Sequence, residues 1–130
     1  MSEFVRVFSG SPYETRFGFC RGIRFADQIQ IAGTAPIDPD GSVHAPGDAF
    51  AQACRCLEIA ALALAELGGN LAQVYRVRWY LTDISQQHDV GRAHAQYFTG
   101  HPPVATMLEV SALVDPQMLV EVELEAWTGA

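Results

Sequence analysis

The sequence predicts an α+β fold in which two helices cover one face of a six-stranded sheet. Several short segments alternate between apolar and polar residues, as strands do, and two longer segments carry apolar residues at the three-and-four spacing of a helix. The predicted order is strand, strand, strand, helix, strand, helix, strand, strand. Because two helices can bury only one face of such a sheet, we expect the other face to contact further subunits around a closed symmetry axis.

The N-terminal third is predicted to form the first three strands. The first covers residues 4–8 and ends at a turn-forming Ser-Gly-Ser-Pro sequence. Residues 17–25 alternate in character and then turn into a strand over residues 28–32, so that the two form a hairpin. Residues 38–41 predict a tight turn, since their proline and glycine supply the φ angles that turns require.

The first long helix is the most strongly indicated element. Asp48 can cap its N-terminus, and Gly68 followed by Gly69 can end it in the left-handed conformation that glycine tolerates. Its expected buried stripe consists of Phe50, Cys54, Leu57, Ala61, Leu64 and either Ala65 or Leu67. A second helix is expected over residues 85–98, with Gly100 closing it.

A strictly alternating segment over residues 74–82 predicts a strand with one apolar and one mainly basic face. The apolar face is expected to hold Tyr75, Val77, Trp79 and Leu81. The other face would carry Arg76, Arg78 and Tyr80. The next strand is predicted over residues 104–110, after two prolines that enforce extended backbone.

The final strand is predicted to carry three carboxylates on one face. Glu121, Glu123 and Glu125 lie two residues apart, and side chains at that spacing share a face of a strand. The opposite, apolar face consists of Val120, Val122, Leu124 and Ala126. Neighbouring carboxylates repel one another, so this face needs arginines, bound water or a second subunit. One interpretation pairs Glu121 with Arg76 or Arg78 in a purely structural network.

Composition narrows the classes of function. The formal net charge is −7, and all eight basic residues are arginine. The absence of lysine excludes a lysine Schiff base, a catalytic lysine base and a P-loop lysine. The arginines are scattered among fifteen acidic residues, so no basic cluster favours nucleic-acid binding. No apolar run is long enough to span a bilayer and no export signal is evident, which predicts a cytoplasmic protein without a membrane partner.

Neither the cysteines nor the histidines form a metal-binding pattern. These residues are Cys20, Cys54, Cys56, His44, His88, His94 and His101. Their spacing fits neither a set of metal ligands nor a disulfide framework, so we expect no metal and no cofactor, and packing or surface roles for the histidines. With 130 residues, the chain fits one domain over residues 1–130.

Six segments of the chain match a known family in their order and spacing. They are Phe19 to Arg24, Ile31 to Thr34, Leu67 to Gly69, Val77 to Asp83, Pro103 to Val110 and Leu119 to Glu123. Over residues 17–127 the chain thereby resembles the Rid family, also called YjgF-like. The resemblance implies a chorismate mutase-like fold and a homotrimer that binds a small-molecule ligand in clefts between subunits. It also implies hydrolysis of reactive enamines and imines, such as 2-aminoacrylate, to a carbonyl product and ammonia.

The resemblance also implies individual site residues. Glu121 falls on the family's glutamate that positions or activates the attacking water. Gly33 falls on a loop glycine whose backbone N–H helps to hold the substrate, and Phe19 falls on a cleft aromatic that is usually tyrosine. Met107 replaces a cysteine beside the substrate, and Thr106 precedes it in the same substrate-binding strand.

Ala105 is the main departure from the family. The deaminating members carry an arginine here that holds the substrate carboxylate in a bidentate pair, worth roughly 1.5–3 kcal/mol. An asparagine of the second helix is also replaced, by Gly91. We therefore expect poor activity on 2-iminopropanoate and 2-iminobutanoate and a substrate shifted away from 2-imino acids. Compensation by Arg76 or Arg78 is one alternative, and a non-catalytic binding or sensing trimer is another.

Overall fold

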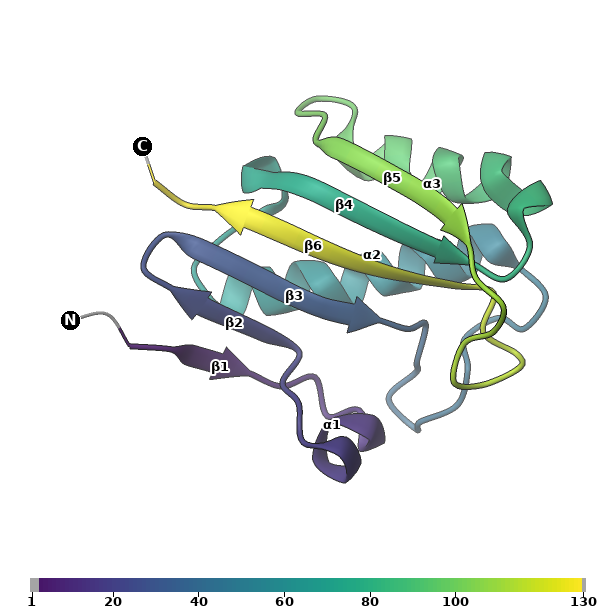
Figure 1. The fold of residues 1–130 in the computed structure, drawn as a ribbon, viewed down its shortest axis with the longest axis horizontal. Helices are drawn as coiled ribbons and strands as arrows, with labels where there is room; N and C mark the ends of the chain where they lie inside the picture. The colour runs from purple at the N-terminus through teal and green to yellow at the C-terminus, as the bar shows by residue number, and fades with distance from the viewer. Residues whose placement is uncertain (1–2, 130) are drawn as a thin grey trace.

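The computed structural model describes residues 3–129, in which six strands form one sheet (Figure 1). The strands are β1 (Val5–Val7), β2 (Gly22–Phe25), β3 (Gln28–Thr34), β4 (Val74–Leu81), β5 (Val104–Glu109) and β6 (Val120–Trp127). Their order across the sheet is β1-β2-β3-β6-β4-β5. All neighbours are antiparallel except β4 and β5, which run parallel. The predicted α+β fold with a six-stranded sheet is confirmed.

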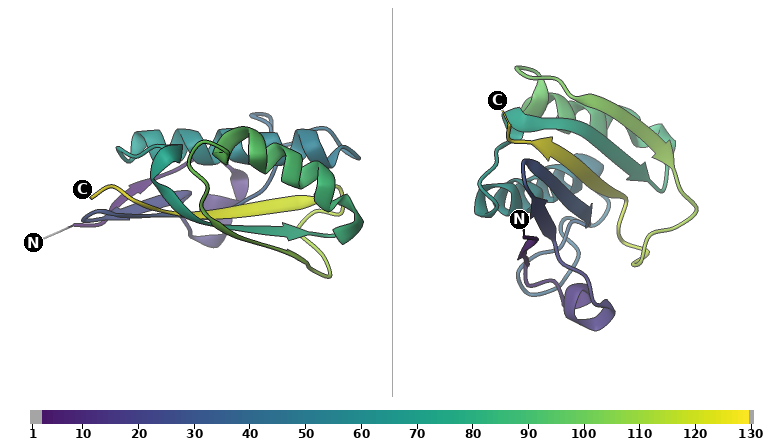
Figure 2. Two further views of the ribbon diagram at one scale, coloured as in Figure 1. Left: turned by 90° about the horizontal axis from the view of Figure 1, so that it is seen from above. Right: turned by 60° about the vertical axis from the view of Figure 1, so that its left-hand side comes forward.

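Two long helices cover one face of this sheet, as predicted. They are α2 (Ala49–Glu66) and α3 (Gln87–Phe98), and both lie on the same side of the strands when the molecule is seen from above (Figure 2). A third, short helix, α1 (Pro12–Phe17), projects beyond the ends of β1 and β2 (Figure 1). Two 3₁₀ turns, η1 (Leu71–Gln73) and η2 (Ile84–Gln86), precede β4 and α3. Within residues 3–129, the other face of the sheet carries no long helix, and we call it the open face.

The ends of α2 follow from the sequence. The Asp48 carboxylate accepts a hydrogen bond from the backbone N–H of Ala51 at 3.0 Å, and Gly68 follows the helix with a φ of 82°. The buried side of the helix contains Ala49, Gln52, Ala53, Cys56, Leu57, Ala60, Ala63 and Leu64. The predicted stripe was therefore partly wrong, because the alanine-rich side packs closest to the sheet. Phe50 lies at its margin, beneath the Arg92 guanidinium of α3, with 4.1 Å between guanidinium carbon and ring centroid.

The segment over residues 17–25 is not one strand, contrary to the prediction. Ser11 caps a helical turn by accepting a hydrogen bond from the Tyr13 N–H, Pro12 occupies the first helical position, and Gly18 ends the turn with a φ of 78°. Phe17 is therefore helical, and pairing with β3 begins only at Gly22. A serine-proline pair fits both a turn and a helix start, and here it starts a helix.

A β-bulge in β4 corrects the predicted position of Tyr75. The pairing with β6 shifts between Val74 and Arg76, so that Val74 faces the core and Tyr75 is exposed. The Tyr75 hydroxyl accepts a hydrogen bond of 2.7 Å from the Gln28 side chain instead. The alternation predicted for Val77, Trp79 and Leu81 is confirmed, since all three are buried.

The core between the helices and the sheet includes one histidine. Trp79 is buried under α3, and its indole N–H donates to His94 Nδ1 at 3.0 Å. Burial lowers the pKa of His94, which favours the neutral ring that can accept this bond. The packing role predicted for the histidines holds for this one.

Candidate functional site

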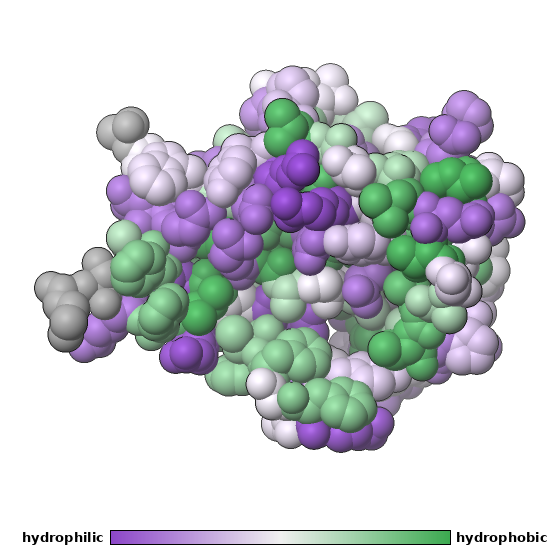
Figure 3. All heavy atoms as spheres, in the orientation of Figure 1, coloured by the Kyte–Doolittle hydropathy of each residue, from purple (hydrophilic) through white to green (hydrophobic). Residues whose placement is uncertain are grey.

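The predicted alternation of β6 is confirmed and leaves three carboxylates on the open face. Val120, Val122, Leu124 and Ala126 are buried on the other side of the strand. The space-filling view shows hydrophilic side chains gathered over β4 and β6 (Figure 3). Because β6 lies in the middle of the sheet, between β3 and β4, the carboxylates are within reach of side chains from both neighbours.

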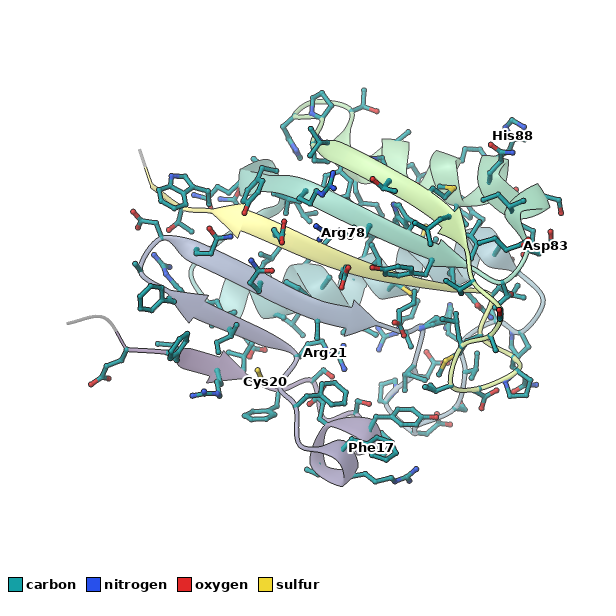
Figure 4. All side chains as sticks on the ribbon, in the orientation of Figure 1. Phe17, Cys20, Arg21, Arg78, Asp83 and His88 are labelled. Carbon is teal, nitrogen blue, oxygen red and sulfur yellow. The ribbon has the colours of Figure 1, made fainter. Side chains whose placement is uncertain are left out.

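Two of the three carboxylates are satisfied by side chains of β4. Arg78 Nη1 lies 3.5 Å from Glu125 Oε1 and 3.8 Å from Glu123 Oε1. The Tyr80 hydroxyl donates a short hydrogen bond to Glu123, and burial together with this bond raises the pKa of Tyr80 to about 12. Figure 4 shows Arg78 over the centre of the sheet, well away from α1. Of the arginines, bound water or second subunit that this face was expected to need, an arginine, Arg78, supplies the pairing for Glu123 and Glu125.

Glu121 is the carboxylate of β6 that Arg78 does not contact. Within the described part of the chain it has no ion-pair partner within 4.0 Å, so the interpretation that paired it with Arg76 or Arg78 is wrong. Partial burial raises the pKa of Glu121 above its usual range, the charge of Arg21 opposes this shift, and Glu123 adds to it. Glu121 is thus a half-buried carboxylate without a direct counter-ion.

A cavity of about 400 Å³ lies beside Glu121, between α1 and the end of β3. The space-filling view shows the hollow above α1 (Figure 3). Most of its wall is apolar and is formed by Tyr13, Phe17, Phe19, Ala32, Ala35, Ile37, Ile59 and Val114. Its polar lining residues are Ser9, Ser11, Arg21, Thr34 and Glu121. An apolar pocket with a few converging polar groups is typical of small-molecule sites.

Gly33 allows the Glu121 carboxylate to lie against β3. A Cβ atom at position 33 would stand 2.6 Å from Glu121 Oε2 and 3.2 Å from its carboxyl carbon. Of the residues predicted for the site, Phe19, Gly33 and Glu121 all line the cavity. One chain therefore brings three of the six predicted site residues together.

Arg21 forms the polar floor of the cavity, and sequence reasoning did not assign it to the site. Its Nε lies 3.0 Å from Glu14 Oε2, and its Nη1 donates to the Gly33 carbonyl at 2.7 Å and to the Thr34 hydroxyl at 3.1 Å. Arg21 and Glu14 are both almost fully buried, and Ser9 donates to Glu14 from its backbone and its hydroxyl. Figure 4 shows Arg21 between α1 and the sheet.

The sequence did contain a signal for Arg21. In the alternating segment it falls among apolar residues on one face, and an arginine on a core-facing position requires a buried acidic partner. Here that partner comes from α1, the helix that was interpreted as a turn. The ion pair fastens α1 to β3 and thereby shapes the cavity wall.

The three predicted site residues of β5 lie elsewhere in the same chain. Ala105 and Met107 pair in register with Val77 and Trp79, on the helix-covered face, and Met107 packs against the core. Thr106 pairs with Arg78 on the open face, but β4 separates it from β6. None of the three lines the cavity. A site that uses both groups needs a second chain to bring β5 to the cavity.

Residues 3–129 contain no group of three or more histidine, cysteine or acidic side chains placed to hold a metal ion. No helix in that range is sufficiently long and apolar to cross a bilayer.

The sheet, its two covering helices and the cavity beside Glu121 define a small α+β protein with a carboxylate at the wall of an apolar cavity. The sequence profile of one family of such proteins, described as Endoribonuclease L-PSP, matches residues 11–128. The chain belongs to this family, which contains the YjgF and Rid proteins, and the resemblance inferred from the sequence is confirmed.

Several relatives match along nearly the whole chain. The uncharacterized protein SCO2049 of Streptomyces coelicolor is 39% identical over 130 residues, which are 99% of this chain and 96% of that protein. The crystal structure of Rv2704 from Mycobacterium tuberculosis, a member of the YjgF/YER057c/UK114 family, has a TM-score of 0.86 at 38% identity and covers 96% of this chain and 99% of its own. The Rid family protein YyfA from Yersinia pestis has a TM-score of 0.86 at 25% identity, with 96% and 99% covered.

Proposed function

We propose that this protein hydrolyses reactive enamines or imines to a carbonyl product and ammonia, in clefts between subunits of a homotrimer. The observation that carries the proposal is the position of Glu121, a half-buried carboxylate without a counter-ion at the wall of an apolar cavity. Such a group accepts a proton more readily than an exposed carboxylate, which suits it to general acid–base work. The chain belongs to the family that contains the Rid proteins, and the resemblance to that family implies the same chemistry.

In the proposed mechanism, Glu121 removes a proton from a water molecule as the water oxygen attacks the imine carbon. The C=N double bond of the protonated imine becomes a single bond, and its electron pair becomes the lone pair of a neutral amino group. In the resulting carbinolamine, Glu121 returns its proton to the amino group, and the C–N bond breaks as the C–O bond becomes a carbonyl. The hydroxyl proton passes to the departing ammonia, which leaves as ammonium. Glu121 ends each cycle in the state in which it began, so no cofactor is needed.

The remaining site residues would hold the substrate. Phe19 and Gly33 line the same cavity as Glu121. In the trimer, β5 of a second copy would bring Ala105, Thr106 and Met107 to the cavity mouth. Because Ala105 offers no charge, small 2-imino acids would lack the carboxylate anchor, and we expect the substrate to be shifted away from them.

The first experiment measures ammonia release from imines that a flavin-dependent amine oxidase generates in the same solution, with an amino-acid oxidase as the source of 2-imino acids for comparison. With the wild-type protein, we expect release faster than the uncatalysed rate for at least one imine. Glu121→Gln should lower the catalysed rate by roughly 10²–10⁴-fold, the usual contribution of a general base. Glu125→Gln is the matched control, since Glu125 lies on the same face of β6 but is held by Arg78. Equal rates for Glu121→Gln and wild type would show that this residue is not the base.

A second candidate is a binding or sensing protein that keeps the cavity but has lost turnover. The alanine at position 105 favours it, because a substrate-holding group of the deaminating members is missing. Acceleration of none of the imines, together with saturable binding of a small molecule, would support this candidate over the hydrolase.

The ribonuclease named in the family description fits the cavity less well. Among the described residues that line the cavity, the arginine is Arg21, which Glu14 neutralises, and the neighbouring Glu121 is acidic. Phosphate recognition requires unpaired basic groups. RNA is therefore not the substrate that we propose.

A further inference from the structure

We propose that the cavity recognises an organic cation, a protonated imine or amine attached to an aromatic or branched apolar group. The inference rests on the proposed function in one respect, since it assigns the substrate class of the same cavity. It goes beyond that function by naming the charge and the shape of the ligand.

Among the charged residues described around the cavity, Glu121 is the one that no neighbouring side chain neutralises. Arg21 and Glu14 are 3.0 Å apart and nearly fully buried, so their charges cancel. Glu121 lies against Gly33, whose carbonyl accepts a hydrogen bond from Arg21, but the Glu121 carboxylate is farther from Arg21 than an ion-pair distance of 4.0 Å. A cation beside Glu121 would balance a poorly solvated carboxylate, whereas a carboxylate ligand would add a second negative charge.

The other charged or titratable groups around Glu121 do not change this balance. They are Tyr80 opposite it on β4, Glu123 on the same strand and Cys56 of α2 behind the sheet. Burial raises the pKa values of Tyr80 and Cys56, so both groups are neutral near neutral pH. Glu123 already shares Arg78 and the Tyr80 hydroxyl. Glu121 is therefore the group left for a cationic ligand.

The wall of the cavity favours an aromatic or branched apolar body. Tyr13, Phe17 and Phe19 place three aromatic rings beside Ile37 and Ile59. Rings next to a carboxylate suit organic cations, because a ring face attracts positive charge. The volume of about 400 Å³ lies within the range of roughly 300–1,000 Å³ of pockets for drug-sized ligands, which is more than a three-carbon imino acid fills.

The strand expected to complete the site does not restore an anion anchor. β5 reads Val-Ala-Thr-Met-Leu-Glu over Val104–Glu109 and contains no basic residue. If a second copy brings this strand to the cavity, the charged group that it adds is Glu109. The completed site would then be no less negative than the cavity of one chain.

The test is binding of two probes with the same number of carbon atoms and opposite charge, 2-phenylethylamine and phenylacetate, measured by calorimetry near neutral pH. We expect the amine to bind roughly tenfold or more tightly than phenylacetate. Ethylamine, which has the charge without the ring, should bind more weakly than 2-phenylethylamine. Equal or tighter binding of phenylacetate, or binding of neither aromatic probe, would overturn the proposal.

Three variants and a pH series assign the preference to this cavity. Glu121→Gln should abolish the preference for the amine, while Glu125→Gln should keep it. Phe19→Ala should weaken 2-phenylethylamine binding more than ethylamine binding, since it removes a ring and no charge. Amine affinity should fall as the pH drops through the raised pKa of Glu121, because the amine stays charged while the carboxylate becomes neutral. A preference that survives Glu121→Gln, or an affinity that does not change with pH, would contradict the assignment.

The outcome is separable from that of the ammonia assay. Selective amine binding without turnover of any imine would support the proposed cationic ligand and would contradict the proposed hydrolase activity. Fast turnover of small 2-imino acids without amine binding would support the hydrolase activity and would contradict the cationic ligand.

Discussion

At the scale of single residues, Gly33 and Glu121 form one unit of the proposed site. The carboxylate occupies the space that a side chain at position 33 would need, with 2.6 Å between Oε2 and the position of a Cβ. Gly33 is not among the glycines with positive φ, so its backbone conformation alone does not require glycine. Glycine is needed instead because the Glu121 carboxylate approaches this position so closely. The need for glycine here is therefore functional and not conformational.

We predict that Gly33→Ala folds normally but loses activity. The clashing atom is the end of a flexible side chain, so Glu121 can rotate away at little cost, and we expect a loss of stability below about 1 kcal/mol. Displacing the carboxylate should lower ammonia release by roughly 100-fold, the effect of misplacing a reacting group by about 1 Å. Urea unfolding and the ammonia assay provide the two measurements. A variant with full activity would show that the carboxylate need not lie against β3.

At the scale of elements, the long segments were predictable, whereas the helix α1 and the bulge in β4 were not. The two helices on one face and the alternation of β6 follow from residue spacing. The helix α1 has only six residues, and the ion pair between Arg21 and Glu14 fastens it to the rest of the fold. The bulge at Tyr75 arises from pairing with β6. Both depend on contacts between distant parts of the chain, which local pattern cannot reveal.

We predict that Gly91→Ala stabilises the protein. Gly91 lies inside α3, and a Cβ there would meet no other atom within 4 Å. Alanine should raise the free energy of unfolding by roughly 0.5–1 kcal/mol, because it favours the helix and restricts the unfolded chain. Thermal unfolding would show an increased Tm. This variant also serves as the glycine-to-alanine control for position 33, and it should keep its ammonia release unchanged. A lower Tm would indicate that a partner subunit packs closely against this position.

At the scale of the whole molecule, the open face accounts for the predicted trimer. Helices bury one side of the sheet, while the other retains exposed apolar side chains around its polar centre (Figures 2 and 3). On β5, Val104 is 60% and Leu108 is 41% exposed, and their register with Arg76 and Tyr80 places both on the open face. Association through this face would bury them and would bring β5 toward the cavity of another copy.

We predict that the protein sediments as a trimer, with about three times the 14.2 kDa mass of one chain. Leu108→Glu should shift it toward smaller species, because it places a charge on an apolar contact. Leu62→Glu is the matched control, since Leu62 is 63% exposed on α2, on the other side of the molecule. If the wild-type protein sediments as a monomer, the proposed site cannot include a second chain. Equal effects of the two substitutions would place the interface elsewhere.

The sequence by itself determined the class of fold, the family and the set of three carboxylates on one face of β6, because residue spacing decides which side chains share a face. Only the tertiary structure decided that Arg78 satisfies Glu123 and Glu125 and leaves Glu121 beside the cavity. It also separated Ala105 and Met107 from Glu121 and revealed the buried Arg21–Glu14 pair. The physical reason is that an ion pair depends on which strands become neighbours and in which register, and those contacts join residues far apart in the chain.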